Sequence, residues 1–356
     1  MAKTMTQPAP EAAPEVMRRL SQVTAKQGLS SLADTLGLLG AFVASELDEL
    51  ERELDAVPRR DELVGQSAAH LLSLGGKRIR PLCVALASRM GEADPFAVRK
   101  LAGAVELVHS ATLLHDDVVD AGEMRRGHPT ARAMYGNAAS VFAGDWLLVE
   151  ALKRVRQAGI PGLLDNLLDI IDEMIQAEAV QLEGRGRIQT DASTYFRVIE
   201  GKTAALFRWA MLAGARAAGL DDDACRALER YGHHLGIAFQ IVDDALDLAG
   251  DPGETGKALF ADLREGKMTY PFIVGLERDP GLARPLERAV RSGEDLSPAE
   301  ARGLLEALER SGAIEAAHDK ATEHAELGAA CLEGLAECKA RGALEAVARV
   351  AADRRA

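Results

Sequence analysis

Aromatic residues are scarce in this sequence: they make up 4% of a 356-residue chain in which 47% of the residues are hydrophobic. Alanine and leucine carry much of the apolar fraction instead, and runs that alternate apolar and polar residues are few. Alanine and leucine are strong helix formers, and strands would need the missing alternation. The composition therefore predicts an all-α protein.

Cysteine is also rare. No CxxC pair occurs, so the sequence suggests neither a structural zinc site nor a disulfide framework. A reducing compartment fits this usage, and we expect a cytoplasmic protein. The four cysteines are scattered, at Cys83, Cys225, Cys331 and Cys338.

Long apolar runs are missing as well. None reaches the roughly 18 to 20 residues that span a bilayer, which argues against an integral membrane protein. Residues 1–15 hold several prolines and no continuous apolar stretch, so they are not typical of a signal peptide. We expect residues 1–30 to form a disordered tail.

Basic residues are fewer than acidic ones, which gives the chain a formal net charge of −13. A protein that coats nucleic acid needs a concentrated basic surface, so the balance argues against a nucleic-acid partner. It does not exclude a local basic pocket.

Breaks rich in Gly, Pro and Asp divide the remaining sequence into long amphipathic segments. Their spacing predicts about ten helices. No linker separates two cores, so we expect one domain over residues 31–356. The breaks lie at 75–76, 91–95, 122–129, 159–162, 184–191, 219–223 and 250–256.

An acidic cluster, LLHDDVVD over residues 113–120, ends an apolar helical stretch that starts near Leu101. On a helix, Asp116 and Asp120 lie one turn apart on the same face, so their carboxylates can converge. Such like charges repel by about 1 kcal/mol per close pair in water, and by more in an apolar cleft. The pattern therefore predicts a bound cation, with Asp117 beside it.

A second cluster, FQIVDDALD over residues 239–247, repeats the DDxxD spacing on another apolar helix. Gln240, Asp243, Asp244 and Asp247 share one face of it. Oxygen-only ligation by carboxylates suits Mg²⁺, which substrate phosphates often bridge. One such cluster could merely cap or solvate a helix end, but two with apolar flanks and following basic loops favour a metal-diphosphate site.

Basic residues stand beside glycines near both clusters. They are Lys77, Arg80, Arg125, Arg126, Lys202, Lys257 and Lys267. In an acidic protein such a set indicates an anion pocket, although any single member could be surface charge. Arg78 and Arg264 are interpreted as plain solvated charges. His109 lies seven positions before Asp116 on the same face, which favours a site residue over an ordinary core histidine.

The motifs GGKRIRP, LLHDDVVDAGEMRRGHPT, GDWLL, GKTAALF, FQIVDDALDL and DLREGKMTYPFI occur in this order from about Gly75 to Pro271. Together they resemble the trans-isoprenyl diphosphate synthase, or polyprenyl synthetase, family. The resemblance implies that residues 31–356 are the catalytic domain, a helical bundle of the isoprenoid-synthase type around a central cavity. It also implies a homodimer and Mg²⁺, three ions per active site. The implied reaction joins isopentenyl diphosphate to an allylic diphosphate of the farnesyl or geranylgeranyl type.

Roles are carried over position by position from this resemblance. The isopentenyl diphosphate site would be Lys77, Arg80, His109 and Arg126; the allylic site would be Arg125, Lys202, Thr203, Gln240, Lys257 and Lys267. The metal ligands would be Asp116, Asp120, Asp243 and Asp247. Residues acting in catalysis would be Asp116, Asp117, Asp120, Arg125, Lys202, Asp243 and Asp244. The glycine-rich segment 251–257 would act as a lid.

The residues just before the first DDxxD motif are small in this chain: Val108, Ala111 and Thr112. Bulky residues there floor the cavity of short-chain members of the family, so these imply a long-chain all-trans product, unless they simply allow helix packing. Two other functions remain open. A class I terpene cyclase would share the acidic motif but needs no second diphosphate site, and a non-catalytic regulatory subunit would not need complete motifs.

Overall fold

The computed structural model describes residues 42–58, 60–249, 259–292, 294 and 296–352. The expected tail at 1–30, the lid at 251–257 and Lys257 therefore lie outside the described residues. Within the described part there are sixteen α-helices, one π-helix, one 3-10 helix and one two-stranded sheet of two residues per strand. The all-α prediction is confirmed. The helices outnumber the ten expected partly because several, such as α7 and α14, have five residues or fewer.

The first half of the chain forms six helices and the small sheet. They are α3 (Ala44–Asp55), α4 (Leu63–Ser73), α5 (Ile79–Ser88), α6 (Pro95–Val119), β1 (Met124–Arg125), β2 (His128–Pro129), α7 (Ala131–Tyr135) and α8 (Asn137–Ala158). The predicted breaks at 75–76, 91–95, 122–129 and 159–162 all fall at or beside the connections between these elements.

The second half completes the bundle. Its elements are α9 (Leu163–Gly184), α10 (Ala192–Ile199), the π-helix η2 (Glu200–Ala204), α11 (Ala205–Ala217), α12 (Asp222–Ala249), α14 (Ala261–Arg264), α15 (Tyr270–Arg278), the 3-10 helix η3 (Pro280–Leu282), α16 (Ala283–Ser292), α17 (Pro298–Arg310), α18 (Ala313–Ala330) and α19 (Lys339–Ala352).

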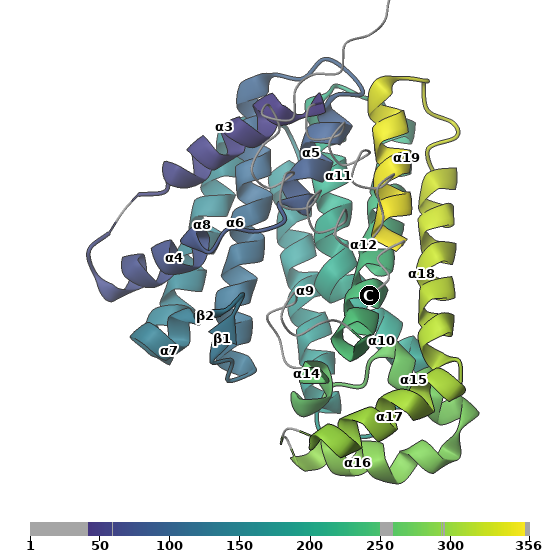
Figure 1. The fold of residues 1–356 in the computed structure, drawn as a ribbon. Helices are drawn as coiled ribbons and strands as arrows, with labels where there is room; N and C mark the ends of the chain where they lie inside the picture. The colour runs from purple at the N-terminus through teal and green to yellow at the C-terminus, as the bar shows by residue number, and fades with distance from the viewer. Residues whose placement is uncertain (1–41, 59, 250–258, 293, 295, 353–356) are drawn as a thin grey trace, which may run out of the picture.

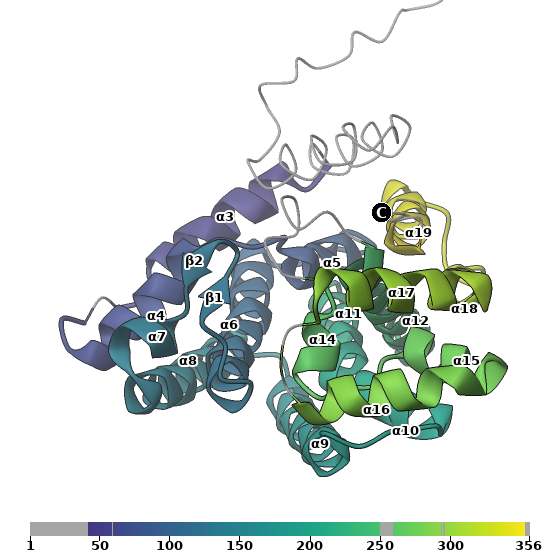
Figure 2. The ribbon, with the colours of Figure 1, turned by 60° about the horizontal axis from the view of Figure 1, so that its bottom comes forward.

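The long helices run side by side, and shorter ones cover one end. Figure 1 shows α6, α8, α9, α11, α12, α18 and α19 standing roughly upright, with α16 and α17 lying across the lower end. Figure 2 brings that lower end forward. The largest apolar core joins α3 to α8 with α11, α12 and α19, and it fully buries Phe207, Trp209 and Tyr231. Smaller clusters lie under α14 to α17 and between α10, α12 and α18.

Helix α6 delivers the first acidic motif to the middle of the molecule. Asp94 caps its start by accepting a hydrogen bond from the Phe96 N–H at 3.0 Å, and Pro95 occupies the first helical position, where its missing N–H costs nothing. The helix thus begins six residues before the expected start at Leu101. It ends at Val119, so Asp116 lies in the last turn and Asp120 is the C-cap.

The glycine of the GDWLL motif sets how closely α8 approaches α6. A Cβ added at Gly144 would lie 2.3 Å from Nε2 of His115, closer than any real contact. Glycine therefore leaves room for the His115 ring between α8 and the helix that carries the first motif, and a larger residue would require that ring to move.

Candidate active site

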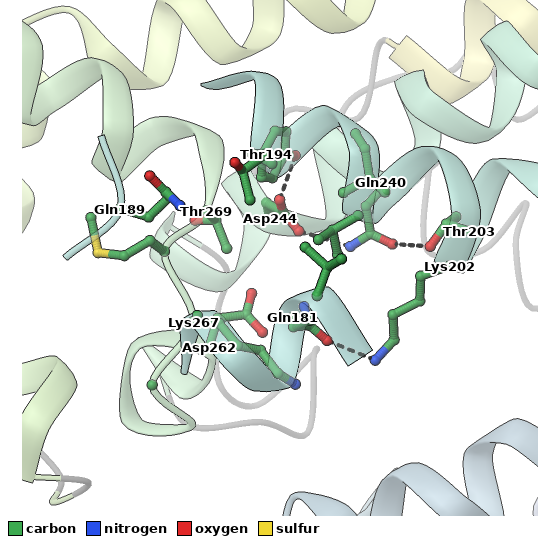
Figure 3. Close-up of a pocket in the computed structure, with 17 residues that line it drawn as sticks. Gln181, Gln189, Thr194, Lys202, Thr203, Gln240, Asp244, Asp262, Lys267 and Thr269 are labelled. Carbon is green, nitrogen blue, oxygen red and sulfur yellow. Dashed lines mark hydrogen bonds between the residues drawn. The ribbon is translucent and has the colours of Figure 1, made fainter. Parts of the chain in front are cut away.

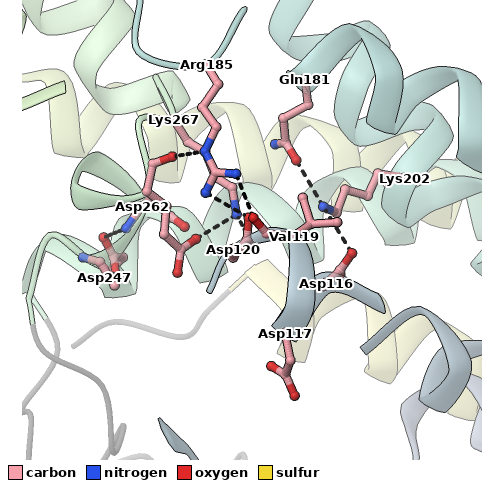
Figure 4. A network of polar contacts seen from close by, with 12 residues as sticks. Asp116, Asp117, Val119, Asp120, Gln181, Arg185, Lys202, Asp247, Asp262 and Lys267 are labelled. Carbon is pink, nitrogen blue, oxygen red and sulfur yellow. Dashed lines mark hydrogen bonds and ion pairs between the residues drawn. The ribbon is translucent and has the colours of Figure 1, made fainter. Parts of the chain in front are cut away.

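The outer carboxylates of the first motif meet cations from the opposite side of the bundle. Nζ of Lys267 lies 2.8 Å from Oδ2 of Asp120, and Nζ of Lys202 lies 3.8 Å from Oδ1 of Asp116. Lys202 also bonds Glu178 at 2.5 Å and Gln181 at 2.9 Å, both on α9. Figure 4 shows this network. The structure thus brings three separate predicted segments together at one place.

Burial and the surrounding charges set the protonation of these groups. Burial raises the pKa of Asp116, Lys202 opposes that rise, and Glu178 and Asp120 add to it. Burial alone would lower the pKa of Lys267, but Glu265 and Asp120 raise it above its usual value, so the lysine stays charged. The site is therefore a set of carboxylates that are neutralised by internal cations in this state of the protein.

The middle aspartate of the first motif plays a different part. Asp117 is 4% exposed and pairs with Arg125, whose Nη2 lies 2.8 Å from Oδ1 and whose Nε lies 3.0 Å from the same oxygen. Its side chain is directed away from Lys202 in Figure 4. Asp117 therefore orients Arg125 in this structure, and Asp116 and Asp120 are the carboxylates that face Lys202 and Lys267.

In the second motif, too, the middle aspartate is buried and already hydrogen-bonded. Asp244 is 3% exposed, and both of its oxygens are occupied: the Tyr195 hydroxyl donates to Oδ2 at 2.6 Å and Nε2 of Gln240 donates to Oδ1 at 2.8 Å. The oxygen of Gln240 in turn accepts from Oγ1 of Thr203 at 2.7 Å. Burial, and then the charge of Asp262, raise the pKa of Asp244 well above its usual value. A hydrogen-bonded chain thus ties the GKT motif to the second acidic motif.

The remaining acids of the second motif lie along the same helix, α12. Asp247 accepts the backbone N–H groups of Ala261 at 3.1 Å and Asp262 at 3.2 Å, one on each oxygen, and so fixes the start of α14. Asp243 is half-buried. As a metal ligand, Asp247 would have to share its oxygens with these amides.

Lys202 and Thr203 face the site from a π-helix. The Ala205 N–H bonds the Glu200 carbonyl, which closes a wider turn than the α-helices on either side. Such single wide turns are frequent at functional sites. Gly201 is required here because a Cβ would lie 2.6 Å from Cβ of Ala177 on α9.

A pocket with about 140 Å³ of free volume lies beside this network. Figure 3 shows Lys202, Thr203, Gln240 and Asp244 along it, with Lys267 from the segment after α14. Polar groups from α9, α10, η2, α12 and the 262–269 segment line it together with apolar side chains such as Val198 and Ile199, so the pocket offers hydrogen-bonding groups beside an apolar wall.

The second predicted cation set gathers around one aromatic pair, Phe207 on α11 and Phe239 on α12. The guanidinium of Arg80 stacks over Phe207 at 4.6 Å, and Nζ of Lys77 lies 5.8 Å from the Phe239 ring. These two rings are 5.5 Å apart. Nε of Arg80 is buried without a hydrogen-bond partner among the described residues. Burial and then the charges of Arg80 and Arg126 hold the pKa of His109 well below its usual value, which marks this region as strongly positive.

Arg126 reaches this region from the turn of the β1–β2 hairpin. Arg126 and Gly127 both have positive φ, 51° and 78°, as the favoured two-residue hairpin turn requires. A Cβ built at Gly76 would lie 3.4 Å from Nη1 of Arg126, so the turn lies directly against the GGKRIRP loop.

The interpretation of Arg78 as a solvated charge is wrong. Arg78 is 6% exposed, and its guanidinium bonds Glu106 on α6 at 2.5 Å and Glu51 on α3 at 3.0 Å. Its φ of 48° turns the chain back at the start of α5, so the buried pair anchors the loop between Lys77 and Arg80. Arg264 is half-buried at the end of α14 and is not a fully solvated charge either.

The three predicted chain-length residues differ in their surroundings. Val108 and Ala111 are buried in the main core, at 1% and 2% exposure. Thr112 is half-buried, and its hydroxyl donates to the His109 carbonyl at 2.9 Å. Of the three, Thr112 is the one whose side chain is not enclosed by core packing.

Four site residues escaped the sequence reasoning: Glu178, Gln181, Arg185 and Tyr195. Glu178 and Gln181 are three positions apart on α9, a spacing that could have drawn attention to them. Tyr195 lies seven positions before Lys202, but no short motif marks it. Arg185 follows α9 directly and donates to Asp120 at 3.0 Å.

Among the described residues, no three acidic, histidine or cysteine side chains already converge on one point as a metal cage. The donor chemistry nevertheless fits Mg²⁺, since Asp116, Asp120 and Asp243 offer carboxylate oxygens. Mg²⁺ is commonly held by one or two carboxylates together with substrate phosphates rather than by a complete protein cage.

The comparisons with known proteins agree with this geometry. Residues 61–307 match the sequence model of the Polyprenyl synthetase family. The chain belongs to this family. This polyprenyl synthetase is 35% identical to "Heptaprenyl diphosphate synthase component 2" of Geobacillus stearothermophilus, over 86% of the chain and 95% of that protein. It is also 35% identical to octaprenyl diphosphate synthase of Escherichia coli, over 82% of the chain and 90% of that protein.

A solved structure extends the agreement to three dimensions. The polyprenyl synthase of Caulobacter crescentus, complexed with calcium and isoprenyl diphosphate, superposes with a TM-score of 0.84 at 36% identity. The match covers 89% of this chain and 97% of that one. The helical bundle of the isoprenoid-synthase type is thereby confirmed, and this chain is a prenyltransferase of that family.

Proposed function

We propose that this polyprenyl synthetase condenses isopentenyl diphosphate with an allylic diphosphate, of the farnesyl or geranylgeranyl type, to make a long-chain all-trans polyprenyl diphosphate. One observation carries the proposal: two separate sets of cations lie near the acidic motifs. Lys77 and Arg80 lie against Phe239 and Phe207, with the charge of Arg80 acting on His109. Lys202 and Lys267 pair with Asp116 and Asp120. Two such sets suit a reaction between two diphosphates.

Mg²⁺ is the proposed cofactor, three ions per active site. Asp116 and Asp120 would hold it from the first motif and Asp243 from the second, with Asp247 sharing its oxygens between the metal and α14. Bound there, the ions would supply positive charge to the leaving diphosphate and so ease cleavage of the allylic carbon–oxygen bond.

The chain's own residues would complete the stabilisation of the leaving group. Arg125 is already oriented by Asp117, and Lys202 and Lys267, now paired with Asp116 and Asp120, would turn to the diphosphate. Once they are bound to the diphosphate, these donors need little further rearrangement when charge develops.

The allylic carbocation needs negative dipoles near it. Gln240 is fixed by Thr203 and Asp244, so its amide cannot turn freely, and backbone carbonyls of the π-helix around Lys202 lie beside it. The isopentenyl double bond then attacks the cation, and the released diphosphate accepts the proton that is lost. This scheme requires no separate protein base.

Product length is the finer part of the proposal. The relatives named above are a component of a heptaprenyl diphosphate synthase and an octaprenyl diphosphate synthase, and this chain has Ala111 and Thr112 where a bulky residue would block the growing chain. Half-burial of Thr112 supports a tail that passes this residue on its way along α6.

We also propose a homodimer that pairs through α8 and α9. The outer face of α9 carries Leu168, Ile175 and Leu182 at seven-residue spacing, and α8 adds Phe142 and Val149. Ile175 and Phe142 are 62% and 61% exposed. An apolar stripe with this repeat is typical of a helix that packs on an equivalent helix, and two-fold pairing lets the same stripe cover itself.

The proposed compartment is the cytoplasm. All four cysteines are free thiols, as in a reducing environment. In the described part of the chain, no helix is both long enough and apolar enough to cross a bilayer.

The deciding assay incubates the purified protein with labelled isopentenyl diphosphate, farnesyl diphosphate and Mg²⁺, and sizes the dephosphorylated products. A ladder that ends in a long prenyl chain and disappears with EDTA is expected. Cyclic hydrocarbon from the allylic substrate alone would favour a terpene cyclase. No incorporation with any allylic starter would favour a regulatory subunit, whose activity would then depend on a second protein.

A further inference from the structure

Arg185 lies where the two halves of the active site meet. It is the first residue after α9, and its extended backbone directs the chain away from the helix. The next residue, Gly186, has a φ of 73°, and its N–H bonds the Gly266 carbonyl at 3.0 Å. The loop after α9 is therefore pinned to the segment that carries Lys267.

The guanidinium of Arg185 makes three hydrogen bonds. Nε donates to the Glu265 carbonyl at 2.6 Å, Nη1 donates to the Val119 carbonyl at 3.1 Å, and Nη2 donates to Oδ1 of Asp120 at 3.0 Å. The first two acceptors are backbone groups of two different segments. They fix the plane of the guanidinium without any help from Asp120, as Figure 4 shows.

The other oxygen of Asp120 is held differently. Oδ2 accepts from Nζ of Lys267 at 2.8 Å, and the same ammonium bonds Glu265 at 2.6 Å. A lysine on a four-carbon stem can move to a new anion by rotating its own bonds, whereas an arginine with three anchors cannot. Of the two oxygens, Oδ2 is the one that can be released.

We propose that Arg185 is a positioning residue for Asp120: it retains Oδ1 throughout the reaction and fixes the carboxylate, so that Oδ2 points to the metal once Lys267 has moved to the diphosphate. This inference rests on the proposed function. Outer groups that hydrogen-bond a ligating carboxylate orient it and commonly account for 10–100-fold in metal affinity.

The charge of Arg185 also matters, because it decides which ligand is favoured. A fixed cation beside Asp120 repels a free metal ion, but it attracts a metal that arrives with a diphosphate, whose negative charge exceeds what one metal neutralises. Arg185 should therefore favour the metal–diphosphate pair over the metal alone.

The test is calorimetric titration with Mg²⁺ and inorganic pyrophosphate, which needs no turnover. In Arg185→Gln we expect binding of Mg²⁺ with pyrophosphate to weaken about 10–100-fold. Arg185→Lys should lie between this variant and the parent, because an ammonium cannot reach all three acceptors. The matched control is Arg187→Gln, which removes an exposed arginine two positions along the same loop and should bind like the parent.

A second measurement distinguishes a positioning role of Arg185 from a general effect on the stability of the protein. The Mg²⁺ concentration needed for half-maximal turnover should rise about tenfold or more in Arg185→Gln, while turnover at saturating Mg²⁺ and the melting temperature change little. Variants that bind Mg²⁺ and pyrophosphate as tightly as the parent would overturn the role of Arg185 while leaving the proposed function intact. A parent that neither binds the pair nor makes prenyl product would overturn both.

Discussion

Within each acidic motif the three aspartates divide the work by the direction of their side chains. Asp117 and Asp244 are buried and bound to Arg125, Tyr195 and Gln240, whereas Asp116 and Asp120 face lysines across the site. Spacing alone could place all of them on two helices. It could not tell which carboxylates already have partners, because those partners come from distant parts of the chain.

Loss of an outer carboxylate should therefore remove catalysis without unfolding the protein. We expect Asp116→Ala and Asp243→Ala each to lower turnover at least about 100-fold, as removal of a group that stabilises transition-state charge commonly does. Turnover is measured as the steady-state incorporation of labelled isopentenyl diphosphate. Asp319→Ala, at an exposed acid on α18, serves as the control and should leave turnover unchanged. Near-normal rates in either site variant would take that motif out of the mechanism.

Among the helices, α6 contributes both to the proposed metal site and to the proposed path of the product. Its last turn holds the acidic motif, and the turn before it holds Thr112. Apolar periodicity predicted the helix, but its start was set by Asp94 and Pro95, whose capping roles depend on local backbone geometry. The small residues Val108, Ala111 and Thr112 predicted free space for a growing prenyl chain. In the structure, core packing encloses Val108 and Ala111.

A bulky side chain at Thr112 should shorten the product. In Thr112→Phe we expect the main product to lose at least one isoprene unit, with total isopentenyl incorporation reduced accordingly, because the ring would occupy the proposed path of the tail. Chromatographic sizing of the dephosphorylated products measures this. Thr112→Ser, which keeps the hydroxyl and removes one methyl group, is the matched control. An unchanged product distribution in Thr112→Phe would show that the tail takes another route.

The pairing of α12 with α18 includes two histidines in contact. Nδ1 of His234 lies 3.2 Å from Nδ1 of His324, which stacks on Phe196. Burial, and then His234, lower the pKa of His324 to about 4; Glu323 opposes this, whereas Lys320 and His233 add to it. The unfolded chain would bind this proton near pH 6.5. The folded protein therefore gains stability above that pH and loses it as the pH falls from about 6.5 toward 4.

Replacing His324 should flatten this part of the stability profile. Urea unfolding of His324→Gln, followed between pH 7 and pH 4, should show a smaller fall in the free energy of unfolding than the parent shows. His128→Gln removes an exposed histidine from β2 and should retain the parent's slope. Equal slopes in the parent and in His324→Gln would mean that acid sensitivity arises elsewhere.

For the whole molecule, composition predicted the all-α class and the motifs predicted the family, because both depend on residues that are close in sequence. The site was harder, since it is assembled from α4–α5, α6, the hairpin, α9, α10, η2, α12 and the segment after α14. Arg185 and Tyr195 could not be found from spacing, because their partners are 65 and 49 positions away. Arg78 was misjudged for the same reason: Glu106 buries its charge from another helix.

The proposed dimer depends on the exposed stripe of α9. A charge at its centre should prevent pairing, because an unpaired carboxylate cannot be buried in an apolar interface at acceptable cost. We expect Ile175→Asp to sediment as a monomer and the parent as a dimer at the same micromolar concentration. Leu327→Asp changes an exposed leucine on α18 in the same way and should leave the dimer intact. A monomeric parent would contradict the dimer itself.

The wide turn at Glu200–Ala204 has a consequence for how this chain can change in length. Each residue of an α-helix advances the direction of its side chain by about 100°. One extra residue in that turn therefore sets the relative rotation of α10 and α11, and with it the side on which Tyr195 meets Asp244. Deleting Glu200 would leave every side chain of the GKTAALF motif present but would turn the two helices out of phase. A register error of this kind would disable the site through rotation alone.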